Sequence, residues 1–242
     1  MNTLSIDIGN TRTKYDFWAD DGLLGREEIP DAKALIDLIQ RGSVEGVIVS
    51  SVNEDPAELI SSLKTSTNCK IVNFNKEEIK KYGNLIQYKG NVGADRIAAY
   101  LGTQDLYKEC PMLIVDMGTA MTLDIADVEG RYRGGNISLG YHSRLKALAS
   151  STKLLPLVND CDHYISFGND TISSIQSGAI NGVMGEISFA AKRAQEEYDI
   201  RHTVMTGGDA KVFYHLMQNQ IDCIYDPYLV SRGLNRHLRM FY

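Results

Sequence analysis

The chain has 242 residues, of which 43% are hydrophobic, with a formal net charge of −6 and a pI of about 5.4. This acidic balance argues against a nucleic-acid-binding protein, which usually displays a basic patch. No apolar run approaches the ~20 residues that cross a bilayer, and no signal peptide is recognisable, so we expect one or two globular domains in the cytoplasm with no nucleic-acid or membrane partner.

Strands alternate with helices in the first half of the chain. Residues 31–40 form an amphipathic pattern that places Leu35, Leu38 and Ile39 on one side of a helix. Short β-branched and apolar runs indicate buried strands. The expected strands span residues 4–8, 13–17, 47–52 and 70–74, and the expected helices span residues 31–40, 56–63 and 95–107. This alternation is typical of an α/β sheet.

The second half of the chain continues the same alternation. Gly134 and Gly135 are expected to interrupt it as a turn. The longest helix contains three glycines at spacings of four and three residues, which places them on one face where another backbone can approach. These glycines are Gly178, Gly182 and Gly185. The expected strands span residues 112–117, 121–127 and 202–205, and the expected helices span residues 144–155 and 171–195.

An internal repeat indicates how the chain is organised. SIDIGNTRTKYDF at residues 5–17 matches IVDMGTAMTLDIA at residues 114–126, and each reads as a strand, a polar turn and a second strand. Duplicated α/β halves that face each other across a cleft explain the repeat more economically than a chance match. We expect an N-terminal domain at residues 1–110 and a C-terminal domain at residues 111–242.

A polar loop follows the first expected strand. Gly9 permits a tight turn whose N–H groups cradle phosphate oxygens, and Lys14 adds a mobile positive charge for a polyphosphate. Asp7, at the strand end, can hold Mg²⁺ directly or through water. For this loop alone, an ordinary β-turn with a solvated lysine is an alternative. The loop reads Asp7, Ile8, Gly9, Asn10, Thr11, Arg12, Thr13, Lys14.

A second loop of this kind begins at Asp116, which would bind a cation, and Thr119 would contact the nucleotide phosphates. The second loop has no counterpart of Lys14, so the two halves are not equivalent. The recurrence makes an ordinary turn the weaker explanation. Together the loops predict a phosphotransferase that uses ATP.

A third candidate segment is Gly93-Ala94-Asp95-Arg96, which opens an expected helix. The N–H groups and the dipole at a helix N-terminus favour anions. Arg96 can form two hydrogen bonds to a carboxylate or phosphate, and Asp95 can take a proton from a substrate hydroxyl. The alternative is that Asp95 is only a favourable charge at the helix start and that Arg96 lies on the surface.

Other patterns point less clearly to chemistry. Two glycine-rich segments lie at residues 134–140 and 206–210. Both can be simple hairpin or helix-start turns, but for residues 206–210 we favour a backbone that lies close to a nucleotide ring. The chain has no metal-binding histidine spacing, no Gly-x-Ser-x-Gly elbow and no Gly-x-x-x-x-Gly-Lys-Ser/Thr loop. Four widely spaced cysteines are expected to be reduced thiols. They are Cys69, Cys110, Cys161 and Cys223.

In this order, DIGNTRTK, GADR, DMGTAMT and GGNISLG resemble the type III pantothenate kinases of the acetate and sugar kinase, Hsp70 and actin superfamily. The resemblance spans residues 7–233. It implies an α/β fold of two duplicated ribonuclease-H-like (actin-like ATPase) halves, and a homodimer. The implied reaction transfers the γ-phosphoryl group of ATP to the primary hydroxyl of pantothenate, which gives 4′-phosphopantothenate in the first step of coenzyme A biosynthesis.

The resemblance also implies roles for individual residues. Asp95 would be the general base, Asp7 would help to place Mg²⁺, and Asp116 would hold K⁺ or NH₄⁺. The implied ATP site consists of Asp7, Ile8, Gly9, Asn10, Thr11, Arg12, Thr13, Lys14 and Thr119. The implied pantothenate site consists of Tyr88, Gly93, Ala94, Asp95, Arg96 and Thr171.

The sequence departs from the family pattern at two loops. Leu139-Gly140 stands where the family usually has Pro-Gly and is followed by Tyr141-His142, and the segment at residues 88–92 lacks a common proline. Two alternatives stay open: another small-molecule kinase of the superfamily, or a non-enzymatic accessory factor for transcription. The second would be expected to have lost catalytic positions, whereas Asp7, Lys14, Asp95 and Asp116 are intact.

Overall fold

The computed structural model describes residues 1–53, 55–107, 110–159 and 164–242. Cys161 therefore lies outside the described residues, while Cys69, Cys110 and Cys223 are free thiols. Within the described ranges, none of the helices is both long and apolar enough to cross a membrane.

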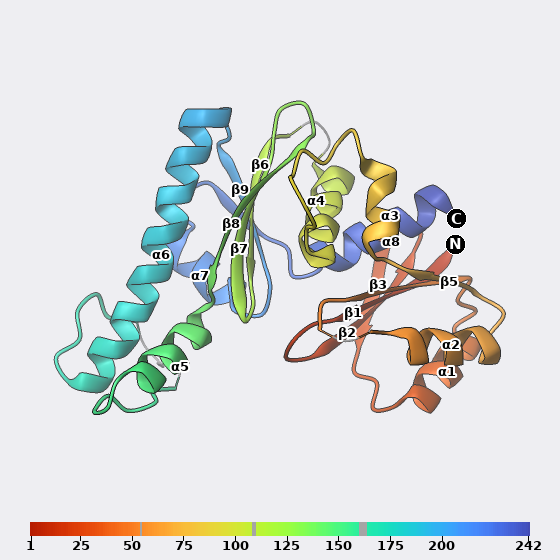
Figure 1. Ribbon diagram of the computed structural model, residues 1–242, viewed down its shortest axis with the longest axis horizontal. Helices are drawn as coiled ribbons and strands as arrows, with labels where there is room; N and C mark the ends of the chain where they lie inside the picture. The colour runs from red at the N-terminus through yellow and green to blue at the C-terminus, as the bar shows by residue number, and fades with distance from the viewer. Residues whose placement is uncertain (54, 108–109, 160–163) are drawn as a thin grey trace. The chain divides into compact units, whose positions relative to one another are not determined.

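The described chain divides into two compact units (Figure 1). The first comprises Met1–Cys110, Gly130–Tyr132 and Tyr228–Tyr242, and the second comprises Pro111–Glu129 and Arg133–Pro227. The sequence predicts a boundary between residues 110 and 111 and assigns all later residues to the second domain. The C-terminal segment Tyr228–Tyr242 belongs to the first unit instead. The last helix packs within the first unit rather than within the second.

The first unit contains a mixed sheet of strand order β3-β2-β1-β4-β5. Its central strand β1 runs antiparallel to β2 and parallel to β4. The sequence analysis did not identify β3, which has glycines at two of its six positions and little buried surface. The strands are β1 (Asn2–Ile8), β2 (Thr13–Ala19), β3 (Gly22–Glu27), β4 (Gly46–Ser51) and β5 (Lys70–Asn73).

Alternation along β1 gives the two faces of this sheet different partners. Leu4 and Ile6 point to one face and pack with Leu35 of α1 and Leu63 of α2. The helices α4 and α8 cover the other face (Figure 1). The helices of this unit are α1 (Ala32–Arg41), α2 (Ala57–Ser66), α3 (Lys76–Ile79), the 3₁₀ helix η1 (Lys80–Tyr82), α4 (Ala94–Leu106) and α8 (Leu229–Phe241).

The face towards α8 combines apolar and polar side chains. Thr3 Oγ1 donates a 2.6 Å hydrogen bond to Asn235 Oδ1, and Ser5 Oγ donates to the Ser231 carbonyl at 3.2 Å. These partners satisfy buried polar groups that would otherwise cost about 1–3 kcal/mol each. The same face carries Asp7 at the end of β1, because side chains two residues apart point the same way.

Close backbone contact attaches α8 to the first unit. Gly102 of α4 lies directly against the Leu229 carbonyl of α8, and Gly233 of α8 lies against the Ala98 carbonyl of α4. A Cβ at either glycine would overlap the neighbouring backbone. The absence of side chains at these two positions therefore lets the helices meet and explains why the C-terminal segment joins the N-terminal sheet.

The second unit repeats the topology of the first, with strand order β8-β7-β6-β9-β10. Its central strand β6 is antiparallel to β7 and parallel to β9, as β1 is to β2 and β4. The repeat seen in the sequence is therefore a repeat of structure, which confirms the expected duplication. The strands are β6 (Met112–Met117), β7 (Ala120–Ala126), β8 (Tyr132–Leu139), β9 (His202–Thr206) and β10 (Cys223–Tyr225).

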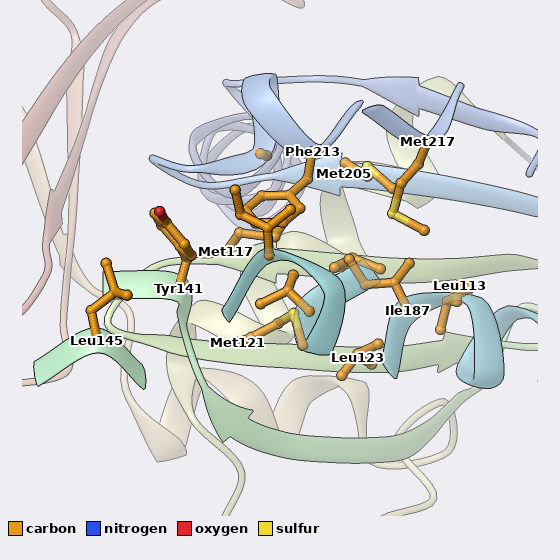
Figure 2. Packing of buried hydrophobic residues seen from close by; sticks show 14 of the residues in the cluster. Leu113, Met117, Met121, Leu123, Tyr141, Leu145, Ile187, Met205, Phe213 and Met217 are labelled. Carbon is orange, nitrogen blue, oxygen red and sulfur yellow. The ribbon is translucent and has the colours of Figure 1, made fainter. Parts of the chain in front are cut away.

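An apolar core joins one face of this second sheet to its helices (Figure 2). Met117 and Met121 of the sheet pack with Ile187 of α6 and Phe213 of α7, and Figure 2 shows Tyr141 and Leu145 of α5 at one end of the cluster. Each such side chain contributes about 1.5–3 kcal/mol when fully buried. The helices are α5 (Tyr141–Ser151), α6 (Thr171–Tyr198) and α7 (Ala210–Met217).

Two expectations for this unit were wrong. Gly134 and Gly135 lie inside β8 rather than in a turn, because Gly135 packs directly against the Leu123 backbone and leaves no room for a side chain. Helix α5 starts at Tyr141, after the N-cap Gly140, and ends at Ser151, whereas residues 144–155 were expected.

A buried histidine links α8 to the segment that follows β5. His237 is 0% exposed, with Nδ1 2.8 Å from Tyr82 Oη and Nε2 2.7 Å from Glu78 Oε2. Burial lowers the pKa of His237 below its usual 6.5, although the hydrogen bond to Glu78 opposes this shift. Burial alone would raise the pKa of Glu78, but hydrogen bonds from Lys81, His237 and Tyr242 outweigh it and lower that pKa.

We predict that acidification destabilises the protein through His237. The unfolded chain takes up a proton as pH falls through about 6.5, while the folded chain does not, so stability is lost from there down to the lowered pKa. The slope is at most about 1.4 kcal/mol per pH unit for one proton. Urea denaturation of His237→Gln, which keeps polar contacts but cannot titrate, should show a shallower slope between pH 7 and 5. Equal slopes in the two proteins would contradict this.

Candidate functional site

The first candidate loop forms the turn between β1 and β2. Asp7 and Lys14 stand opposite each other across these strands, and Lys14 Nζ lies 3.5 Å from Asp7 Oδ2. The Gly9 N–H donates to the Arg12 carbonyl at 3.2 Å, so this group is used inside the turn. Residues 10–12 at the tip are exposed. The part of the loop that can meet a phosphate is therefore this tip together with Lys14.

Asp7 is a buried carboxyl with a cation beside it. Its exposed fraction is 7%. Burial raises the pKa of Asp7 above its usual range, and the nearby Lys14 opposes that effect. Such a carboxylate is stabilised by any further cation that approaches its oxygens. Asp7 therefore has the electrostatic character of a cation ligand rather than of a surface charge.

The chemistry of this loop fits a magnesium ion that keeps most of its water. Among the described residues, no cluster of three or more histidine, cysteine, aspartate or glutamate side chains could hold a metal. Mg²⁺ needs no such cluster, because it is usually bound by one or two carboxylates together with waters and substrate phosphates. Asp7 supplies one carboxylate near the end of β1, which is sufficient for Mg²⁺ binding of this kind.

The Gly93–Arg96 segment begins α4. Gly93 is the N-cap residue, and the Asp95 carboxylate accepts a 2.8 Å hydrogen bond from the Arg96 N–H through Oδ1. A Cβ on Gly93 would lie 2.5 Å from that same oxygen. Glycine at this position therefore leaves space for Asp95 to fold back on the helix start. The hydrogen bond fixes the direction of the carboxylate.

Arg96 is buried between aromatic rings rather than lying on the surface. Its exposed fraction is 5%, and its guanidinium carbon lies 5.5 Å from the ring centroid of Tyr88 and 6.0 Å from that of Tyr132. Cation–π contacts of this kind restrain the direction of the guanidinium. The surface alternative for Arg96 is thus wrong. The structure brings Tyr88 and Arg96 together, as expected.

Tyr132 is a residue that the sequence analysis missed. It is fully buried in the first unit, where its N–H donates to the Leu85 carbonyl and its carbonyl accepts from the Gln87 N–H, both at 2.8 Å. Its ring also packs against Tyr100, with centroids 5.6 Å apart. No spacing rule connects residue 132 with residue 96, so only tertiary contact could reveal this neighbour.

The second candidate loop lies at the end of β6. Asp116 stands opposite Thr122 of β7 and beside Thr206 of β9. The partner of Asp116 is six positions along the chain, while the partner of Asp7 is seven positions along, so the second turn is one residue shorter. A neutral threonine stands opposite Asp116, where Lys14 stands opposite Asp7.

Two further segments pack around this second loop. The exposed Thr119 presents its carbonyl inward, where it accepts hydrogen bonds from Gly140 N–H at 3.1 Å and Ser143 Oγ at 2.6 Å. Gly207 has φ of +98°, and a Cβ there would lie 2.5 Å from Asp116 Oδ1. The backbone of Gly207 therefore approaches the Asp116 carboxylate closely, and glycine is the residue that fits there.

Thr171 lies in the second unit, at the first position of α6. Asp170 caps this helix in a capping box with Ser173. Thr171 borders a cavity of about 770 Å³ between α5 and α6. The cavity wall combines apolar side chains with Arg144, Asn169 and Asp170. Thr171 therefore belongs to a different unit from Tyr88 and Arg96.

Comparison with known proteins decides the family. The sequence profile described as type III pantothenate kinase matches residues 3–193. The chain belongs to this family. A type III pantothenate kinase from Porphyromonas gingivalis is 31% identical over 241 residues, covering 97% of each chain. One from Cytophaga hutchinsonii is 31% identical over 238 residues and covers 96% of this chain and 97% of its own.

Solved structures place the kinase in the two-unit α/β fold that was expected. A Baf family transcriptional activator from Campylobacter jejuni, so described, has a TM-score of 0.62 at 23% identity and covers 98% of both chains. A ROK hexokinase from Thermus thermophilus has a TM-score of 0.56 at 12% identity and covers 99% of both chains. At these identities the likeness concerns the fold alone, and it confirms the actin-like fold class.

We predict different consequences for two neighbouring glycines of the kinase. Gly207→Ala should lose about 2 kcal/mol or more of stability, because φ is +98° and the new Cβ would press on Asp116. Gly208→Ala is the matched control, since a Cβ there meets nothing within 4 Å, and it should change stability by less than about 0.5 kcal/mol. Chemical denaturation measures both, and equal losses would refute the strain at Gly207.

Proposed function

We propose that the chain is an ATP-dependent pantothenate kinase in which the residues of both loops and of the α4 start act as the family resemblance implies. The observation that carries this is a family match over residues 3–193, a span that includes Asp7, Lys14, Asp95 and Asp116. The reaction moves the γ-phosphoryl group of ATP to the primary hydroxyl of pantothenate, in the first step of coenzyme A biosynthesis.

The first unit supplies the proposed ATP and acceptor residues. The Asp7–Lys14 loop holds the phosphates, with Lys14 as their cationic contact, and Asp7 places Mg²⁺. When bound, Mg²⁺ neutralises charge on the transferred phosphate. Arg96, held by Tyr88 and Tyr132, receives the carboxylate of pantothenate in a two-bond fork. Asp95 accepts the hydroxyl proton, since its direction is already set by the Arg96 N–H.

The second unit supplies the proposed cation and further substrate contacts. Asp116 holds K⁺ or NH₄⁺, which is supported by the threonine opposite it in place of a lysine. Thr119 contacts the nucleotide, and Thr171 contacts pantothenate from the cavity beside α6. These roles rest on the resemblance and on the burial and neighbours of each residue.

We also propose that the kinase is a homodimer and acts in the cytoplasm. Along α6, a Cβ on Gly178 or Gly185 would meet nothing within 4 Å, and Phe189 is 65% exposed. This open face is available to a second copy. The free thiols agree with a reducing compartment. Sedimentation equilibrium would contradict the dimer if the mass at micromolar concentration were that of one chain, 26.9 kDa.

We expect the purified protein to form ADP only when both Mg-ATP and pantothenate are present. A coupled ADP assay over pantothenate, small sugars and small hydroxy acids tests this against the alternative of another small-molecule kinase. A non-enzymatic accessory factor would turn over none of them.

In the same assay, Asp95→Asn should lower kcat by about 10²–10⁴-fold, the usual contribution of a general base, while ATP binding is retained. The amide keeps an oxygen that can accept from the Arg96 N–H but cannot take the proton. Asp105→Asn, at the far end of the same helix, is the control and should leave kcat near wild type. A kcat for Asp95→Asn equal to that of wild type would exclude Asp95 as the base.

We further expect turnover to require K⁺ or NH₄⁺ and to be weak with Na⁺ alone. Asp116→Asn should raise the K⁺ concentration that gives half-maximal rate by about tenfold or more, because one charge-assisted contact is lost. Activity that is independent of the monovalent cation would show that Asp116 has another role.

A further inference from the structure

An ion pair between a buried aspartate and a partly exposed arginine lies in the first sheet, close to the loop at residues 7–14. Asp16 of β2 stands directly opposite Arg26 of β3. The Asp16 side chain is 0% exposed, and Arg26 donates from Nε to Oδ1 and from Nη2 to Oδ2, both at 2.7 Å. The Tyr228 ring covers the guanidinium, whose carbon lies 4.7 Å from the ring centroid. Both carboxylate oxygens of Asp16 are therefore bound to a single fork.

This pair lies on the same sheet face as Asp7 and Lys14 of the first candidate loop. The register pairs Asp7 with Lys14 and Ser5 with Asp16 across β1 and β2. Because Lys14 and Asp16 are two residues apart in one strand, they point to the same face about 7 Å apart along it. A lysine side chain is long and flexible enough to turn towards either carboxylate. In the structure it lies 3.5 Å from Asp7.

Each carboxylate on this face has its own cation in the structure: Lys14 lies beside Asp7, and Arg26 binds Asp16. Asp16 is more deeply buried than Asp7, and a buried carboxylate without a partner is strongly unfavourable. If Arg26 did not occupy Asp16, Lys14 would be a mobile cation on the same face, two residues away in the same strand. Lys14 would then pair with Asp16 and move away from its position beside Asp7.

We infer that Arg26 is a positioning residue for Lys14: by binding both oxygens of Asp16, it leaves Lys14 available to the phosphates of ATP. The inference rests on the proposed function, in which Lys14 contacts ATP. Arg26 acts through Asp16 and Lys14 and touches no substrate. A purely structural ion pair at this position would affect stability but not the affinity for ATP.

The test is a charge-removal series read out by the Kd of Mg-ATP in titration calorimetry. Arg26→Gln exposes Asp16 to Lys14 and should weaken ATP binding about tenfold, the size of one charge-assisted contact. The double variant Asp16→Asn with Arg26→Gln removes the competing carboxylate, and its Kd should return to within about twofold of wild type. This recovery is the decisive result, because a merely structural role gives no reason for it.

A matched control separates affinity from stability. Asp105 in α4 of the same unit binds Arg239 at 3.1 Å and Arg236 at 3.4 Å and is 11% exposed. Asp105→Asn should lower the melting temperature without changing the Kd of Mg-ATP. If Arg26→Gln does the same, or if the double variant binds ATP as weakly as the single one, the inference is overturned.

Two further outcomes are interpretable. If Arg26→Gln does not fold, Arg26→Lys replaces it in the series. An ammonium cannot bind both oxygens of Asp16 as the guanidinium does, so the Kd of Mg-ATP should still rise by about threefold. An unchanged Kd overturns the inference. A wild-type protein that binds Mg-ATP but does not phosphorylate pantothenate contradicts the proposed function alone. The binding series still tests Arg26 in that case.

Discussion

The alternation of side chains along β1 is the constraint on which the first unit depends. Leu4 and Ile6 point into the apolar core formed with α1 and α2. Thr3 and Ser5 point the other way and are bound by α8. Asp7 follows in the same row, so the pleat that builds the core also delivers the carboxylate to the polar face. A shift of one residue in register would exchange the two sets and remove both core and site.

The duplicated topology gives the protein two similar strand ends that have become chemically different. Both sheets have the same order and directions around β1 and β6. In the first, Asp7 has Lys14 opposite it, and in the second, Asp116 has Thr122. The first carboxylate thus faces a lysine across the strand pair, whereas the second faces a threonine. The type of residue opposite each carboxylate, lysine in one half and threonine in the other, distinguishes the two strand ends.

Much of this could be predicted from the residues. Strongly periodic segments such as α1 and the buried β4 were identified because burial imposes their pattern. The sequence does not predict β3, because this strand buries little of its surface, and it suggests a turn within β8, because the close backbone contact of Gly135 leaves no local pattern. The sequence also does not predict where α8 packs. The close contact between α4 and α8 depends on both Gly102 and Gly233, which are 131 positions apart in the chain.

By itself the sequence determined the repeat, the two loops and the candidate residues at the start of α4, because those depend on residue type and local spacing. Tertiary structure alone decided which groups surround them. It placed Arg96 between Tyr88 and Tyr132, and it placed Arg26 on Asp16 beside Lys14. The physical reason is that electrostatic and aromatic contacts act over a few ångströms in space, whereas the positions that make them are separated by the path of the chain.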